Sequence, residues 1–275
     1  MIRTLTYTNN LGRSIEFSAE SVWHFAGNDL FNIKTEYSQV GNTITSFSKG
    51  IREFALNAYL RNGTVHDINN FIDVISYDMH VAKPGILRAG ESYMYCYISS
   101  CELAEYQHID GYANLSLTVL SDNPVWIRKS IATLTQRTSK PVDGLNYPYN
   151  YPYNYLMSND ENASVTNPFQ LPAKCNISFS GPCVSPYVII GRNRYQVLGA
   201  TASKGQLIII RGFGTKDIVV KDIDGSETSI FELGVRKQNA HCFAEIPVGE
   251  NTASWPGTPN IEISIYEERM SPWQI

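Results

Sequence analysis

Polar and apolar residues alternate along most of this chain, and this period of two constrains the fold more than any other feature. Short examples run from Ser14 to Ser18 and from Asn32 to Tyr37. Longer strand candidates run from Ile51 to Leu60, from Ser92 to Leu103 and from Tyr112 to Leu120. Successive side chains of a strand point to opposite faces, so this period places one set in a core and the other in solvent. The first half of the chain is therefore predicted to be mainly strands, with turns at Asn9–Gly12 and Gly41–Asn42.

One segment has a different period. Apolar residues recur there at spacings of three and four, with Phe71 alongside: Val65, Ile68, Ile72, Ile75 and Met79. This spacing predicts one amphipathic helix over about residues 64–82. Thr64 and Asp67 form a capping-box pattern at its start, and Pro84-Gly85 ends it. The apolar stripe is expected to cover a sheet face; a groove for a partner is the alternative.

The second half again consists of strand candidates, and a different segment precedes them. Prolines 148 and 152 lie within the run Asn146–Tyr155, which alternates Tyr with Pro and Asn. Proline at this spacing blocks both a helix and a regular ladder, so residues 139–164 are predicted to be a linker. It would separate an N-terminal β-domain with one helix (1–138) from a C-terminal β-sandwich (165–275). The expected strands of the second domain are Cys175 to Phe179, Tyr187 to Ile190, Tyr195 to Leu198, Gln206 to Arg211, Asp217 to Val220 and Ile261 to Tyr266.

The composition indicates a surface that other protein could cover. Charged residues are 17% of the chain and there are 17 tyrosines, whereas about 25% charged residues is typical. Neutral polar and aromatic groups cost little to desolvate, which suits protein contacts; a β-rich domain with aromatic strands is the other explanation. The net charge of −4 argues against a nucleic-acid partner. No apolar run approaches the roughly 20 residues of a membrane span.

Residues that could carry catalysis or bind a metal do not form a recognisable pattern. The five cysteines contain no CxxC pair, and the histidines (His24, His66, His80, His108 and His241) do not follow zinc-site spacing. The segment Asp222–Glu227 superficially resembles an acidic calcium loop, but Asp224-Gly225 is better explained as a tight hairpin turn. We therefore expect no catalytic residue, no cofactor, no metal site and no enzymatic activity. The cysteine pattern favours synthesis in a reducing cytoplasm, and the N-terminus lacks a signal-peptide core, so no secretion through a leader is expected.

Aromatic residues of the second half could form a binding surface. Tyr187, Tyr195, Trp255 and Trp273 are candidates for contact with a saccharide or a protein partner. Tyrosine and tryptophan also commonly pack in a core or anchor a protein interface, and this is the alternative to saccharide contact.

Several segments, in their order along the chain, resemble the distal tail proteins of siphophages (the Dit family). The resemblance spans nearly the whole chain, and the order of the segments makes it specific. The similar segments are Tyr7–Phe17, Arg52–Leu60 followed by a helix and by Lys83–Leu87, Ser121–Trp126, the Tyr-Pro-Tyr-Asn run and Ile263–Trp273.

This resemblance implies a ring-forming N-terminal domain and a galectin-like C-terminal sandwich, in a six-membered ring at the virion tail tip. The implied partners are other copies of the chain, the tail tube protein, the tail-associated hub protein and the receptor-binding protein. No catalytic residues come with the resemblance. The alternative function is a host cell-wall saccharide-binding module of a phage baseplate that acts through the C-terminal sandwich.

Overall fold

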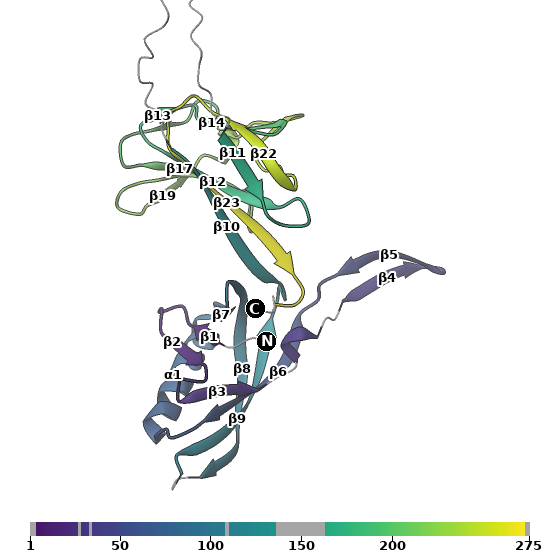
Figure 1. Cartoon of the computed structure of the whole chain (residues 1–275), viewed down its shortest axis with the longest axis vertical. Coiled ribbons are helices and arrows are strands. Elements are labelled where there is room, and N and C mark those ends of the chain that lie inside the picture. Colours follow the sequence, from purple (N-terminus) through teal and green to yellow (C-terminus); the bar gives the residue numbers. More distant parts are fainter. Residues whose placement is uncertain (1–3, 27–28, 33–34, 108–109, 136–162, 273–275) are drawn as a thin grey trace, which may run out of the picture. The chain divides into compact units, whose positions relative to one another are not determined.

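The computed structural model describes residues 4–26, 29–32, 35–107, 110–135 and 163–272 (Figure 1). The chain forms two compact units, one of residues 1–128 with 268–275 and one of residues 129–267. Both are built from strands, and a single α-helix occurs among these residues. The predicted mainly β fold with one helix is therefore confirmed. The Tyr-Pro-Tyr-Asn run lies outside the described residues, so the linker and the domain limits at its ends stay predictions.

The sheet of the first unit closes on itself. Its strands follow the order β8-β7-β1-β2-β3-β6-β9, and β9 also pairs with β8. Alternate side chains of β6 and β9 are buried, as the period of two predicts. The bounds are β1 Leu5–Thr8, β2 Ser14–Phe17, β3 Trp23–Ala26, β6 Arg52–Leu60, β7 Gly85–Ala89, β8 Ser92–Gln107 and β9 Tyr112–Ser121; β10, Trp126–Leu134, begins in this unit and continues into the second.

The helix α1, Val65–Val81, packs on β8 and β2 of this sheet. Its buried residues are Phe71, Val74, Ile75 and Asp78, which recur at the helical spacing. The predicted stripe is thus correct in period. Phe71 and Ile75 are buried and Ile68 packs against the core, but Val65, Ile72 and Met79 are 50, 42 and 42% exposed. The buried face instead places a carboxylate, Asp78, in line with three apolar side chains. Burial of Phe71 against Phe17 and Trp23 fixes this orientation.

The predicted capping box is confirmed at the start of α1. The backbone N and the Oγ1 of Thr64 donate hydrogen bonds of 2.7 and 2.8 Å to Asp67 Oδ2. These bonds lower the pKa of the Asp67 carboxyl. The helix ends at Ala82, which adopts the left-handed conformation with φ of 52° and donates its backbone N–H to Met79.

The strand expected at Asn32–Tyr37 begins later than its alternation indicates. A 3-10 turn, η1, spans Asp29–Phe31, and the strand β4 covers Glu36–Val40. It pairs with β5, Thr43–Ser48, around the turn predicted at Gly41–Asn42. These two strands form a separate sheet from the rest of the unit.

The second unit is a sandwich of two sheets around one core. One sheet has the order β19-β18-β17-β12-β23-β10 and the other β11-β22-β14-β15, and both contribute to the same buried cluster. The predicted turn at Asp224-Gly225 joins β18 to β19. The bounds are β11 Ala163–Asn167, β12 Lys174–Ser180, β13 Cys183–Val184, β14 Tyr187–Ile190, β15 Asn193–Gln196, β16 Thr201–Ala202, β17 Leu207–Arg211, β18 Asp217–Lys221, β19 Glu227–Ser229, η2 Phe231–Leu233, β20 Arg236–Lys237, β21 Ala240–His241, β22 Gly249–Ser254 and β23 Ile261–Arg269.

Candidate assembly surfaces

The β4–β5 hairpin extends away from the other strands of its unit (Figure 1). Every residue of both strands is exposed. Four of them are large and apolar: Tyr37, Val40, Ile44 and Phe47 are 60, 73, 52 and 68% exposed. An isolated two-stranded hairpin is at best marginally stable in water. The hairpin therefore offers apolar surface that is suited to contact with another molecule.

A β-bulge gathers three of these side chains on one face. Tyr37 pairs with Phe47, but the register shifts so that Gln39 pairs with Ile44. Tyr37 and Gln39 share a face because they are two residues apart, and their partners Phe47 and Ile44 share it too. Without the bulge, Phe47 and Ile44 would point to opposite faces. One side of the hairpin is thus aromatic and aliphatic.

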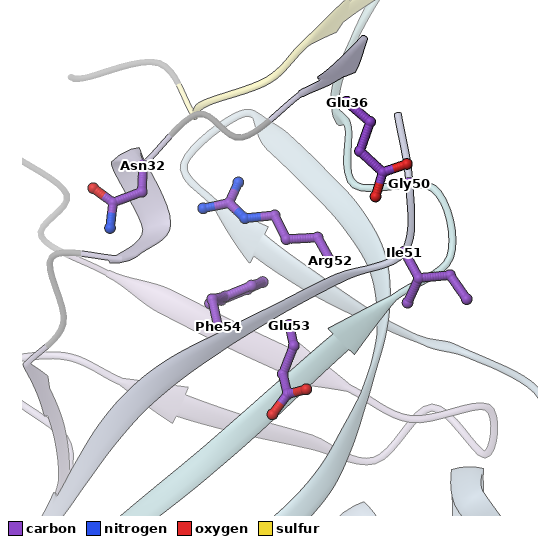
Figure 2. A pocket seen from close by; sticks show the side chains of 7 residues that line it. All are labelled: Asn32, Glu36, Gly50, Ile51, Arg52, Glu53 and Phe54. Atoms are coloured by element: carbon purple, nitrogen blue, oxygen red, sulfur yellow. The ribbon is translucent and has the colours of Figure 1, made fainter. Parts of the chain in front are cut away.

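The root of the hairpin surrounds a cavity of about 380 Å³. Figure 2 shows the Arg52 side chain extending over Phe54, and its guanidinium carbon lies 5.2 Å from the ring centroid. Arg52 is only 7% exposed and donates from Nη1 to the Met270 carbonyl at 3.5 Å. Nearby, Lys49 Nζ lies 3.5 Å from Glu268 Oε2. Residues 268 and 270 therefore brace the root, while the strands beyond it remain unsupported.

A buried polar network fixes a different turn of this unit, the one between β1 and β2. Asp78 is fully buried, and its Oδ2 accepts a hydrogen bond of 2.7 Å from the Tyr7 hydroxyl. Its Oδ1 accepts bonds of 2.9 and 3.0 Å from the backbone N and Nδ2 of Asn10. Burial and the bond to Asp78 raise the pKa of Tyr7 above its ordinary value. A Cβ at Gly85 would collide with Asp78 and Tyr7, so only glycine fits beside the network.

The four aromatic residues singled out in the sequence do not form one platform. Tyr195 is fully buried, and its hydroxyl donates to the Ala244 carbonyl at 3.2 Å, so its ring presents no face to a ligand. Tyr187 is half-buried under Arg194, whose guanidinium carbon is 4.0 Å from the ring centroid. Trp255 is partly buried against the sandwich core. Trp273 lies outside the described residues.

No group of three or more His, Cys, Asp or Glu side chains within the described ranges could hold a metal ion. The five cysteines are free thiols. Burial raises the pKa of Cys175 to about 12, so this thiol is neutral at physiological pH. In the part of the chain that the structure covers, no helix is both long and apolar enough to span a membrane.

The fold is similar to that of SPP1 Dit and of a chain in the phage P2 baseplate. The chain is 12% identical to SPP1 Dit, a hub adsorption protein of phages that infect Gram-positive bacteria, with a TM-score of 0.55 over 96% of this chain and 99% of that one. Chains of the phage P2 baseplate in its activated conformation match over 98% of this chain and 99% of their own. The calcium-bound form gives a TM-score of 0.62 at 12% identity, and the strontium-bound form 0.58 at 13%.

At these identities the likeness defines the fold, and it confirms the resemblance seen in the sequence at that level. No protein-family profile matches the chain, and no curated protein sequence matches it. The similarity is therefore carried by backbone geometry over almost the whole chain.

Sequence reasoning did not single out the hairpin as a candidate assembly surface. Its apolar residues were indistinguishable from core residues, because alternation alone does not reveal whether a second layer covers the strand. The turn Gly41-Asn42 between two short, weakly alternating runs was a usable signal for the hairpin itself. Sequence reasoning also missed Asp78, because the partners of a carboxylate on an apolar helix face cannot be read from local spacing.

Proposed function

We propose that this chain is a structural distal tail protein of a siphophage or prophage. In this proposal it forms a six-membered ring that joins the tail tube to the tail-tip hub and the receptor-binding apparatus. It acts by assembly and catalyses no reaction. The whole-chain fold likeness to Dit and baseplate proteins supports the role, and the virion tail tip is the corresponding location.

The observation that carries the proposal is the exposed β4–β5 hairpin. Burying Tyr37, Ile44 and Phe47 against a neighbour would remove large apolar side chains from water, each worth about 1.5–3 kcal/mol when fully buried. In a ring of more than two subunits the hairpin would bind a different surface of the next copy. A head-to-tail contact of this kind generates closed rings or filaments.

Electron microscopy of negatively stained protein tests this proposal. The wild-type chain, alone or mixed with tube and hub proteins, should form rings, and light scattering should give the corresponding mass. The double variant Tyr37→Ser, Phe47→Ser should remain monomeric. Its matched control is Ser38→Ala, Ser46→Ala, which changes a cross-strand pair on the opposite face of the same hairpin and should still form rings. A wild-type chain that stays monomeric with every partner would contradict the proposal.

A second candidate function is binding of a host cell-wall saccharide by the second unit. Tyr187 favours it, because its half-exposed ring lies on the outer face of β14 beside Arg194. A cell-wall pull-down of the full chain tests it. Retention that is lost in Tyr187→Ala and kept in Tyr95→Phe would support saccharide binding, whereas equal retention of the two variants would exclude this site.

A further inference from the structure

The second unit carries a cluster of cations around two stacked rings. Phe231 and Phe243 have their ring centroids 5.8 Å apart at 24°. The Arg236 guanidinium carbon lies 3.9 Å from the Phe231 centroid, and Lys216 Nζ lies 5.8 Å from that of Phe243. His241 meets Phe243 edge to face at 6.1 Å. We call these five side chains the cationic patch.

The Arg236 guanidinium is held in place but is not neutralised. Its Nη2 donates a hydrogen bond of 2.6 Å to the Phe231 carbonyl, and the guanidinium also bonds to the Cys242 side chain. A guanidinium has five N–H donors, so others remain for a ligand. Neither Arg236 nor Lys216 forms an ion pair with a carboxylate among the residues that the structure describes. Burial raises the pKa of the Cys242 thiol, and the charges of Arg236 and Lys216 oppose this shift. Both cations therefore lie close enough to this thiol to influence it.

Exposed aliphatic side chains border the patch. Leu233 follows Phe231 in η2, and its carbonyl accepts a hydrogen bond of 2.9 Å from the backbone of Leu198. Next to that segment, Gly199 N donates to Ser185 Oγ at 2.9 Å, beside Val184. Leu233, Leu198 and Val184 are 38, 58 and 74% exposed. Stacked arginine and aromatic side chains next to aliphatic ones are typical of protein interfaces. The aliphatic border therefore favours a protein partner over a charged polysaccharide.

A matching partner needs carboxylates interspersed with apolar side chains, and this chain carries such a segment itself. Residues 102–107 at the end of β8 are all exposed. There the register shift between Leu103 and Glu105 brings Glu102 and Glu105 to one face of the strand, and Leu103 and Tyr106, 54 and 39% exposed, to the other. Within the described ranges, the ladder partners of this segment all lie in β9, so its other edge is available for contact.

We propose that the cationic patch of one subunit binds the β8 segment 102–107 of a second copy. Arg236 and Lys216 would face Glu102 and Glu105 on one face of the strand, and the aliphatic border would reach Leu103 around its other edge. The proposal rests on the homo-oligomeric function above and names a contact separate from the β4–β5 hairpin. In the proposed ring each copy would use its patch toward one neighbour and its β8 segment toward the other.

Reversing the charge on each side tests this contact in the full chain. Lys216→Glu, Arg236→Glu should weaken self-association at least about tenfold, because like charges would then face each other. Glu102→Lys, Glu105→Arg should weaken it to a similar extent. The chain carrying all four changes should recover most of the wild-type association. Sedimentation velocity at low and high salt measures the self-association of each variant. The matched control is Lys204→Glu, at an exposed lysine of the same unit.

The outcomes separate this inference from the proposed function. Wild-type assembly that both reversals leave unchanged would overturn the contact while the ring remains. Weakening by each reversal without recovery in the fourfold variant would also overturn it. A patch reversal that abolishes only binding to an anionic wall polysaccharide would assign the patch to that ligand instead. A wild-type chain that never self-associates would refute the proposed function itself.

Discussion

Two hairpins of the first unit differ in whether their own chain buries their side chains. The turn between β1 and β2 is tied to α1 through Asp78, and the strands around it bury every second side chain. The β4–β5 hairpin buries no side chain and is braced only at its root. The first hairpin is stabilised by contacts within the chain, whereas the second leaves its apolar side chains in solvent. In the proposed ring, this difference would separate residues that maintain the fold from residues that serve assembly.

The largest loss of stability is expected when the network under the first hairpin is broken. Asp78→Ala would leave the Tyr7 hydroxyl and two donors of Asn10 without their buried acceptor. We expect a loss of about 3 kcal/mol in the free energy of unfolding, measured with urea. Asp73→Ala, on the exposed side of the same helix, should change it by less than about 0.5 kcal/mol. Equal losses in the two variants would show that the network does not anchor the turn.

A smaller loss is expected when the Tyr7 hydroxyl alone is removed. Tyr7→Phe keeps the ring in the core and removes one of the three hydrogen bonds to Asp78. The expected loss is about 1–2 kcal/mol, since a buried carboxylate then lacks one donor. Tyr95→Phe, at a side chain that is 40% exposed, serves as the control and should be nearly neutral. A Tyr7→Phe protein as stable as this control would contradict the prediction.

The helix cap should contribute less, and in a pH-dependent way. Asp67→Asn should cost about 0.5–1 kcal/mol at neutral pH, in the range of helix-cap substitutions. The hydrogen bonds from Thr64 lower the pKa of Asp67 in the folded chain. Its stabilisation is therefore fully present above the unfolded-state pKa and is lost as the pH falls through the folded-state pKa. The thermal unfolding temperatures of the wild-type chain and of Asp67→Asn should converge at acid pH. A difference in unfolding temperature that stays constant with pH would argue against the cap.

The smallest effect on monomer stability should come from the second hairpin. Tyr37→Ser, Phe47→Ser changes only exposed side chains, so the free energy of unfolding of the monomer should change by no more than about 0.5 kcal/mol. The same variant is the one expected to lose assembly. Urea unfolding at a protein concentration below that of association provides the measurement. A loss of unfolding free energy comparable to that of Asp78→Ala would show that these hairpin side chains stabilise the monomer.

The sequence predicted local structure better than contacts between distant segments. Spacing alone located α1 and its cap, because both depend on residues within one turn of each other. Part of the predicted stripe was wrong, because Ile72 and Met79 are exposed and Asp78 is buried. This orientation depends on the packing of α1 against β8 and β2, which lie elsewhere in the sequence. Alternation likewise assigned Tyr195 to a strand but could not decide that its ring points inward. The exposure of β4 and β5 follows from a layer that is missing over them, and no pattern within those residues records it.

Amide hydrogen exchange over residues 36–48 tests the central claim most directly. In the monomer these amides should exchange rapidly, because the hairpin has no covering layer and can open locally. In the assembled state the same peptide should become strongly protected, while peptides of β6 and β9 change little. Protection of the hairpin that is equal in monomer and assembly would contradict the account, since the hairpin would then be stabilised within its own chain.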